Sequence, residues 1–542
     1  MSDEKNKSGG HQSPEISRIQ DMFKTGGLNR REFMQGLMAT GLSVTAAGVL
    51  VAGTPDALAM TPKKGGKITF GWDQHGPADT LDPGLFTSTI DYARGRAHFN
   101  NLLQFNDDTT MRGELAEEWS SNANATEFTF KLRKGVKWHD GTDFNADDVV
   151  YSMNRHIGEN AVSKAKGLVS MITEWKKVDS HTVKAILSSP NSDLPQILGT
   201  FHFKIIQNGG AEKDGYWQLP VGTGPYKTIE FTPGVRSRHV RNDDYWREGA
   251  NLDELEIFAI TDNTSRVNAL ISGDIDIMGN LDPKAIKQVE ASPGVEVFGV
   301  ESGATTHIGA MLDREPTNNH DFVTGLKFLQ PRQRLVRSVL KGQGGIGNDH
   351  TIGPSYSDHC FDLPIRPHDP DQAAFHLKKS GVTSAVLHTA EVGLGAVDMC
   401  LVLQAEAAKV GFDLKVKRVP GDGYWGTTWM NQPLSVTSWN MRPTANVMMS
   451  LMYKSDAPWN ECVFKSERFD ELLLEVRGVT DKSLRQEMYC EMQTLVHNDG
   501  GNLMPFHRNY VDAISSKVKG IPKVPLAAVG GCEFPEFVWL DS

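Results

Sequence analysis

The sequence has few of the features that mark specialised classes of protein. It contains no internal repeat and no low-complexity tract, which excludes solenoids, propellers and collagen-like fibres. Positive charge is in deficit, with 56 Lys and Arg against 67 Asp and Glu and a formal net charge of −11. A general nucleic-acid binder is therefore excluded, because neutralising phosphates needs concentrated positive charge. The 542 residues, 39% of them hydrophobic, suit a globular chain of several domain-sized units.

Cysteine is also scarce. The cysteines all lie in the last third of the chain: Cys360, Cys400, Cys462, Cys490 and Cys532. An odd number cannot all pair, and no C-x-x-C spacing indicates a zinc site. One or two disulfides would suit an oxidising compartment. Buried free thiols are the alternative, and we slightly favour it.

Motifs of catalysis and cofactor binding are missing as well. The sequence has no H-E-x-x-H, no G-x-S-x-G and no P-loop. Residues 342–347 satisfy G-x-G-x-x-G, but a predicted helix precedes them and Pro354 follows, whereas a dinucleotide site needs a strand before and a helix after. His350, His359 and His368 are nine residues apart, without the close spacing of metal ligands. We predict no catalytic residue, no metal and no cofactor.

The N-terminus resembles an export signal. A polar stretch leads to Arg30 and Arg31, Phe33 follows, a weakly apolar run covers residues 36–53, and Ala-Leu-Ala ends at Ala59. This order resembles a twin-arginine signal peptide over residues 1–59, cleaved after Ala59. The alternative is a membrane anchor, but the run is interrupted by Gly, Ser and Thr and fits a spanning helix poorly. We expect export by the twin-arginine machinery to the periplasm as a soluble protein.

Strand and helix patterns alternate along the mature chain. Strands are predicted at 67–72, 127–132, 183–187, 252–260, 274–278 and 510–515, and helices at 146–156, 264–271, 331–340, 370–380, 396–410, 466–477 and 482–498. Asn145 is a predicted N-cap, and Gly273 and Gly381 are predicted helix ends. The class is mixed α/β, and it favours lobes joined by short crossing segments over separate domains on linkers.

Several blocks in a fixed order carry a family resemblance. They lie at residues 80–83, 113–119, 128–141, 145–150, 221–226, 241–246, 273–276, 485–496 and 504–506. Together they resemble the bacterial extracellular solute-binding protein family 5, which includes peptide-, nickel-, glutathione- and opine-binding components of ABC importers. The order and spacing agree over nearly all of residues 65–520.

The resemblance implies a periplasmic binding protein-like fold with two lobes, a hinge and an extra subdomain in the first lobe. Lobe I core would comprise residues 60–88, 218–298 and 512–542, the extra subdomain 89–217, and lobe II 299–511. It also implies a monomer that encloses a small solute between its lobes and presents it to permease subunits in the membrane. Such a protein is not an enzyme and has no nucleic-acid partner.

The sequence departs from the peptide binders of the family where their ligand's charged ends are held. These proteins share Trp-x-x-Asp, whose carboxylate pairs with the ligand's ammonium; the aligned residues are Trp439 and Arg442. Their carboxylate-binding Arg aligns with Val397 or Asp398. An Arg suits a carboxylate or phosphate rather than an ammonium. We therefore hypothesise a peptide or peptide-like ligand with an acidic group near Arg442. The alternative is that Arg442 faces solvent or pairs with Asp398.

Aromatic residues near the expected cleft complete the candidate site. Tyr424, Trp425, Trp429, Trp439 and Trp459 could contact ligand, although about half could be core. Gln74, His75 and Asn460 are further candidates. A competing function is a metal-chelate-binding protein or a cofactor-containing enzyme exported in folded form; elemental analysis of the native protein would separate the two.

Overall fold

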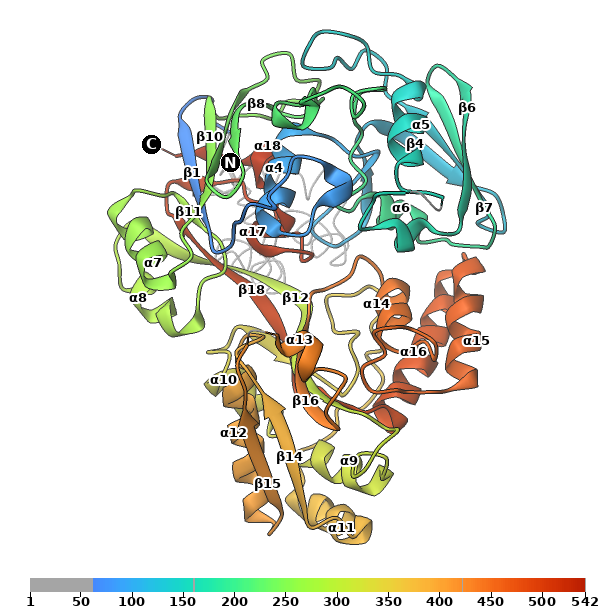
Figure 1. Cartoon of the computed structure of the whole chain (residues 1–542), viewed down its shortest axis with the longest axis vertical. Coiled ribbons are helices and arrows are strands. Elements are labelled where there is room, and N and C mark those ends of the chain that lie inside the picture. The colour runs from blue at the N-terminus through green and yellow to red at the C-terminus, as the bar shows by residue number, and fades with distance from the viewer. Residues whose placement is uncertain (1–61, 159–160, 422, 542) are drawn as a thin grey trace, which may run out of the picture. The chain divides into compact units, whose positions relative to one another are not determined.

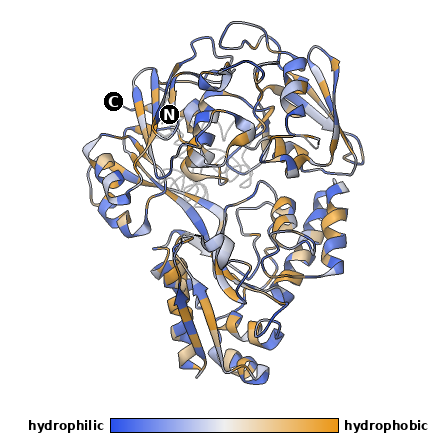
Figure 2. Cartoon of the chain, viewed as in Figure 1, coloured by the Kyte–Doolittle hydropathy of each residue, from blue (hydrophilic) through white to orange (hydrophobic). Residues whose placement is uncertain are grey.

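The computed structural model describes residues 62–158, 161–421 and 423–541, and the predicted signal peptide lies outside these residues. Residues 64–542 form one compact unit by their contacts, built from mixed helices and strands (Figure 1). Figure 2 shows apolar and polar residues interspersed along most of these elements. The predicted α/β class is confirmed.

The strands and helices have the following bounds. The strands are β1 Lys67–Trp72, β2 Leu103–Phe105, β3 Met111–Gly113, β4 Ala116–Ser121, β5 Glu127–Leu132, β6 Ile172–Asp179, β7 Thr182–Leu187, β8 Tyr226–Thr232, β9 Arg236–Arg241, β10 Glu254–Ala259, β11 Ile277–Met278, β12 Val295–Ala310, β13 Gly344–Ile346, β14 Ser384–Thr389, β15 Asp413–Arg418, β16 Leu434–Trp439, β17 Asn502–Leu503, β18 Phe506–Ser515, β19 Val518–Lys519 and β20 Trp539–Leu540. The α-helices are α4 Thr89–His98, α5 Ala146–Asn154, α6 Leu194–Leu198, α7 Asn263–Ser272, α8 Ile286–Glu290, α9 His320–Phe328, α10 Arg332–Ser338, α11 Pro370–Ser380, α12 Ala396–Lys409, α13 Tyr424–Thr427, α14 Ala445–Met452, α15 Glu467–Glu475, α16 Lys482–Asp499, α17 Ala528–Gly531 and α18 Phe534–Phe537.

A 12-stranded sheet runs through the unit in the order β15-β14-β16-β12-β18-β11-β1-β10-β9-β8, with β13 and β17 paired beside this path. The strands at one end of this order come from residues 384–439, and those at the other from residues 67–278. Two strands in its middle, β12 and β18, therefore join the segments predicted as lobe I core and lobe II (Figure 1).

The middle strand β12 changes its pairing along its length. Val295 to Val300 pair with the second half of β18, the register shifts, and Ala304 pairs with Arg508. From Thr305 onward the strand also pairs with β16. A Cβ at Gly303 would lie 2.5 Å from the Tyr356 ring, so only glycine allows this close approach at the break.

The predicted extra subdomain has its own core. A separate four-stranded sheet, β4-β5-β7-β6, covers residues 116–187. Its buried apolar side chains form a cluster made almost entirely of residues 102–205, with Val447 as the one distant member. Other clusters occupy the sheet's two ends. The domain boundaries given above remain a prediction.

Most predicted elements match the structure within two residues. The strands at 67–72 and 127–132 are β1 and β5, and Asn145 caps α5 in a capping box with Asp148. Gly273 ends α7 at φ 82°, the left-handed conformation that glycine permits. The segment 342–347 contains β13, a strand paired with β18, in place of a phosphate-binding turn.

The strand predicted at 274–278 was too long. The N–H groups of Asp274 and Ile275 donate back to the carbonyl of Ala269, so these residues complete the end of α7. Pairing begins only at Ile277, and β11 is two residues long. Helix-capping hydrogen bonds therefore replaced strand pairing over the first half of the predicted segment.

The expectation of free thiols was wrong for one pair. Cys360 and Cys490 form a disulfide across 130 residues of sequence, while Cys400, Cys462 and Cys532 are free and buried. The sequence could not show this pair, because only the packing of the 347–366 loop against α16 brings the two thiols together. Among the described residues, no helix is both long and apolar enough to cross a membrane.

Several histidines are buried in neutral form, and His239 is the clearest. It is fully buried, with Nδ1 3.0 Å from Thr228 Oγ1 and Nε2 2.9 Å from Ser237 Oγ. Burial, and then the Arg94 charge, lower its pKa to about 3. Burial likewise lowers the pKa of His156 and of His507 to about 3.

We expect His239 to make folding sensitive to acid. The unfolded chain takes up a proton below a pKa of about 6.5, and the folded chain does not, so stability is lost progressively from pH 6.5 towards pH 3. At pH 5 the loss from this residue is about 2 kcal/mol. The fall in unfolding free energy between pH 7 and pH 5, measured with urea, should be smaller by that amount in His239→Gln. His320→Gln, at an exposed position, is the control. An equal fall in His239→Gln and wild type would contradict the expectation.

Candidate functional site

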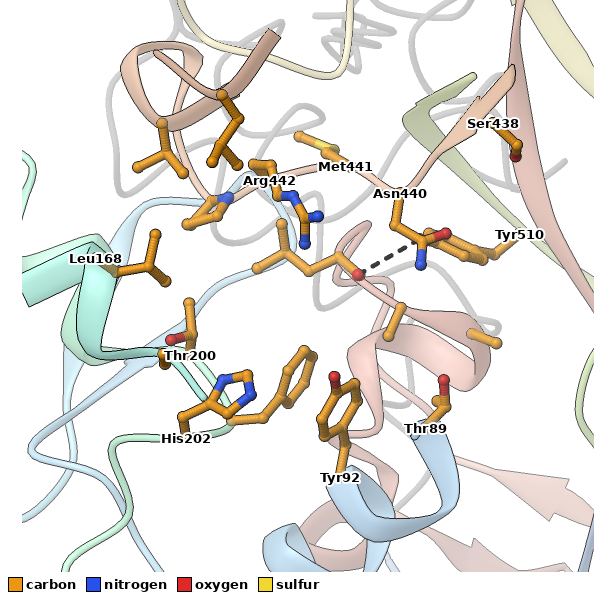
Figure 3. A pocket seen from close by; sticks show the side chains of 18 of the residues that line it. Thr89, Tyr92, Leu168, Thr200, His202, Ser438, Asn440, Met441, Arg442 and Tyr510 are labelled. Atoms are coloured by element: carbon orange, nitrogen blue, oxygen red, sulfur yellow. Dashed lines mark hydrogen bonds between the residues drawn. The ribbon is translucent and has the colours of Figure 1, made fainter. Parts of the chain in front are cut away.

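A cavity with a volume of about 1300 Å³ lies in the described part of the chain. Its walls come from three segments: lobe I core as predicted, the predicted extra subdomain and predicted lobe II. Residues that characterise the walls are Asp73, Arg266, Leu168, Thr200, His202, Asn440, Arg442 and Arg508. Figure 3 shows Arg442 facing Tyr92, Thr200 and His202 across this space. A ligand inside would contact segments far apart in sequence.

Arg442 is positioned by the end of β16. That strand pairs with β12 through Trp439 and Thr305 and stops at Trp439. The backbone N–H of Arg442 then donates to Tyr356 Oη at 3.0 Å. The guanidinium carbon lies 5.9 Å from the centre of the Trp439 ring, a cation–π geometry. The side chain therefore leaves the sheet's end and enters the cavity (Figure 3).

The buried carboxylate of Glu461 fixes the position of the Trp439 side chain. Its Nε1 donates to Glu461 Oε2 at 3.1 Å, and the same oxygen accepts hydrogen bonds from Trp429 Nε1 at 2.7 Å and Thr437 Oγ1 at 2.8 Å. The other carboxylate oxygen lies 2.8 Å from His307 Nε2. This network fixes the indole on which Arg442 rests.

Two other arginines that line the cavity are used by the fold. Arg266 donates to the backbone carbonyls of Ile260, Thr261 and Asn280, and Arg477 donates to Asn446 and Ser450. Arg442 differs from both. Its side chain has no hydrogen-bond partner and no ion pair among the described residues, and its Nε is buried.

The Arg442 charge contributes to the pKa shifts of neighbouring side chains in the cavity. Burial raises the pKa of Tyr92 to about 12, and the Arg442 charge opposes this shift. Burial also lowers the pKa of His202; a hydrogen bond to the Phe86 carbonyl opposes this, and Arg442 adds to it. His202 is therefore neutral at pH 7, and it does not increase the positive charge. Arg442 therefore contributes a positive charge to this wall that no carboxylate of the described residues pairs with.

One end of the cavity is apolar. Leu168, Met171 and Ile197 come from the predicted extra subdomain, and Val447 and Leu451 come from α14. All five belong to or pack against one hydrophobic cluster. An ion pair also joins the predicted extra subdomain to α16, since Arg485 Nη2 lies 2.9 Å from Asp193 Oδ1. The cavity thus offers an apolar end beside a positively charged wall.

Four of the residues considered from sequence lie at or directly behind this cavity. Arg442, Trp459 and Gln74 line it, and Trp439 lies behind Arg442 with 6% of its surface exposed. Four indole rings form a row in the order Trp425, Trp429, Trp439 and Trp459, with successive ring centres 5.5, 6.4 and 5.9 Å apart. Trp425, at the other end of this row, is 45% exposed and does not line the cavity.

Other candidates lie elsewhere. Tyr424 is fully buried, and its hydroxyl donates to the Val436 carbonyl at 2.7 Å. Asn460 is buried, and its amide donates to the carbonyls of Lys454 and Phe464. Both side chains are occupied by the fold, so neither is presented to a ligand in this cavity. His75 is exposed in a loop, with Nδ1 against the Gly234 carbonyl.

Asp398 lies on a neighbouring cavity of about 180 Å³, which shares Asp282, Glu391, Gly393 and Leu394 with the large one. No ion pair joins it to Arg442 among the described residues, so the alternative of a structural Arg442–Asp398 bridge is not what the structure contains. Asp398 is exposed in the first turn of α12.

Sequence reasoning missed Arg508, Tyr510, Asn440 and Tyr92, which also line the cavity. Asn440 lies between Trp439 and Arg442, in the stretch that aligns with the peptide binders, so the sequence could have indicated it as a site residue. Arg508 and Tyr510 lie on β18, 66 and 68 residues after Arg442. Only the order of strands in the sheet places them beside β16, and no local pattern in the sequence shows that order.

Comparisons with known proteins agree with this architecture. The family described as "Bacterial extracellular solute-binding proteins, family 5 Middle" matches residues 110–461. The chain is similar to the dipeptide-binding protein of Escherichia coli (strain K12), with 25% identity over 538 residues, covering 91% of this chain and 96% of that protein.

Solved structures show the same fold. An ABC transporter-associated periplasmic binding protein, DppA from Helicobacter pylori in complex with peptide STSA, matches with TM-score 0.72 and 22% identity, covering 89% of this chain and 99% of that one. HbpA2 from Haemophilus parasuis matches with TM-score 0.78 and 19% identity, covering 88% and 100%. In the described residues, no group of three or more His, Cys, Asp or Glu side chains is arranged to hold a metal ion.

Proposed function

The chain belongs to the bacterial extracellular solute-binding proteins of family 5, and on that premise we propose that it captures a small, acidic, peptide-like solute and delivers it to the permease of an ABC importer. Its relatives include a dipeptide-binding protein and a peptide-bound periplasmic binding protein. They support a peptide-like ligand, and the cavity supports its charge. The protein acts by binding and release, without chemistry on the solute.

Capture would proceed by closure of the two lobes about the break in β12. The cavity is lined from both predicted lobes, so a ligand there gains contacts in the closed state that it lacks in the open one. Only such differential contacts shift the population towards closure. A micromolar dissociation constant would correspond to roughly −8 kcal/mol of binding free energy.

Arg442 is the observation that carries the proposed ligand class. Its guanidinium enters the cavity without a carboxylate partner in the described residues. A ligand ammonium placed opposite this group would be left unpaired beside a like charge, at a penalty of several kcal/mol. A ligand carboxylate would instead accept charge-assisted hydrogen bonds from it. We therefore propose a ligand whose acidic group meets Arg442 and which has no free ammonium there.

The remaining candidates take supporting roles in this proposal. Trp439 positions Arg442, and Trp459 and Gln74 contact the ligand from the rim. Trp425, Asp398 and His75 lie outside the large cavity and are assigned no ligand contact. The proposed site of action is the periplasm, reached as a monomer through the twin-arginine machinery. That route depends on Arg30 and Arg31, which lie outside the described residues.

A ligand series tests the proposed function. The mature chain, residues 60–542, should bind N-acetyl-Ala-Ala at least about tenfold more tightly than Ala-Ala, because only the latter brings an ammonium to the arginine. Calorimetry gives the affinities, and thermal shift checks them. N-acetyl-Ala-Ala-amide, which lacks the carboxylate, is the control and should bind weakly. Strong binding of Ala-Ala that is unchanged in Arg442→Ala would overturn the proposal.

A further inference from the structure

We infer that the ligand carries two anionic groups, the second of which is bound by Arg508. The inference rests on the proposed function and names the ligand class more narrowly: a compact solute with two carboxylates or equivalent acidic groups. Arg442 holds one of them. Arg508 and Asn440, which also line the cavity, form the second anion-binding position.

The sheet places the two arginines on either side of one strand. Arg508 on β18 pairs with Ala304 of β12, and the next residue, Thr305, pairs with Trp439 on the opposite neighbour, β16. Arg442 follows three residues after Trp439. Since adjacent strands are about 4.8 Å apart, the backbones of β16 and β18 lie about 10 Å apart. Long side chains from these positions can therefore reach two groups of one small molecule.

Arg508 has most of its donors unused. A guanidinium has five N–H donors, and the one hydrogen bond of this group among the described residues runs from Nη2 to Asn440 Oδ1 at 3.1 Å. Its Nε is buried without a partner. No carboxylate oxygen of the described residues lies within 4.0 Å of the charged nitrogens of Arg508 or Arg442. Arg442 has no side-chain hydrogen bond within the described part of the chain.

The charges of Arg508 and Arg442 both act on Tyr510. The Arg508 guanidinium lies 5.7 Å from the centre of the Tyr510 ring. Burial raises the pKa of Tyr510, and the charges of Arg508 and Arg442 both oppose that shift. The Tyr510 hydroxyl donates to the Leu526 carbonyl at 3.4 Å, so it neutralises neither guanidinium. Figure 3 places Tyr510 and Asn440 together beside the cavity.

Two positive charges without counterions in a partly buried wall are unfavourable in the empty protein. Buried charged donors left without acceptors cost more than neutral ones. A ligand with one acidic group would satisfy Arg442 and leave Arg508 in this state. A ligand with two would satisfy both, and arginine is well suited to bind each acidic group with paired N–H donors. Two arginines without a carboxylate partner in the described residues therefore favour a doubly acidic ligand over a singly acidic one.

The test compares two probes of equal size that differ in one charge: N-acetyl-Ala-Glu and N-acetyl-Ala-Gln. Affinities are measured by calorimetry for wild type, Arg508→Gln, Arg442→Gln and Arg337→Gln. Arg337 is exposed on α10 and lines neither cavity, so its variant is the matched control. Circular dichroism and melting temperature confirm that each variant folds.

We expect wild type and Arg337→Gln to bind the Glu probe about tenfold to a hundredfold more tightly than the Gln probe. That range corresponds to the free energy of one hydrogen bond to a charged group, which only the Glu probe makes with Arg508. In Arg508→Gln this preference should disappear, with the affinity for the Gln probe changed by less than about threefold. Arg442→Gln should weaken both probes. Equal losses for both probes in Arg508→Gln, or an intact preference, would overturn the inference while leaving the proposed function standing. No binding of either probe to the wild-type protein would contradict the proposed function itself.

Discussion

Replacing Arg442 with Glu should reduce the affinity for N-acetyl-Ala-Ala by at least about a hundredfold. The substitution removes charge-assisted hydrogen bonds worth about 1.5–3 kcal/mol. It also sets a carboxylate against the ligand's own, and like charges juxtaposed in an interface can cost several kcal/mol. Calorimetry on the mature chain measures the loss directly.

The neutral variant separates these two contributions. Arg442→Gln removes the charge without reversing it, and we expect a smaller loss of about tenfold to a hundredfold. Neither variant should unfold the protein, because the Arg442 side chain has no hydrogen bond within the described residues and rests only on the Trp439 ring. If Arg442→Glu bound the probe as tightly as wild type, the acidic end of the ligand would have to be held elsewhere.

Replacing Asp349 with Ala should lower the free energy of unfolding by about 3–5 kcal/mol. Asp349 is fully buried, and its Oδ2 accepts hydrogen bonds from Arg332 at 2.7 Å and from Arg366 at 3.0 Å. Its Oδ1 accepts from Gln330 and from the Met504 backbone N–H, each at 3.0 Å. Removing the carboxylate leaves two guanidinium groups without their partner in the interior.

The electrostatics of this cluster support the size of that effect. Burial alone would favour the neutral acid, but the charges of Arg332, Lys327 and Arg366 hold the pKa of Asp349 well below its usual range. Urea unfolding of Asp349→Ala and of Asp413→Ala provides the measurement and its control. Asp413 is exposed and pairs with Lys415 at the surface, so its loss should cost less than about 1 kcal/mol. Similar values for the two variants would show that the buried cluster adds little.

The fold could be predicted where local physics decides it. The sequences of β1 and β5 show the apolar or alternating apolar–polar pattern of a strand. Asn145 caps α5, as its side-chain chemistry favours. The 16-residue β12 and its break could not be predicted, because pairing with β18 and β16 defines it. The Cys360–Cys490 disulfide depends on contacts across 130 residues, which spacing alone cannot indicate.

The residues of the site also divide into those that the sequence could identify and those that it could not. Arg442 could be identified because it replaces an acidic residue beside a matching tryptophan. Tyr424 could not be distinguished from a ligand contact, since sequence alone does not show whether an aromatic side chain near a cleft is directed into the core. In the structure its hydroxyl donates to the Val436 carbonyl. Arg508 was missed because its position beside Arg442 arises from strand order. Local sequence therefore identifies single exceptional residues, and the sheet brings them together.

Arg442 and Arg508, which have no carboxylate partner in the described residues, also bear on how quickly a solute could be captured. The whole chain is acidic, at −11, so a solute anion is repelled at long range in dilute buffer. At physiological ionic strength the screening length is about 8 Å, and charges on the far surface are largely hidden from a solute at the cavity mouth. The charges that line the cavity, Arg442 and Arg508 among them, then act on the solute at short range. Moderate salt would thus assist association by removing the distant repulsion, until higher salt also screens the arginines.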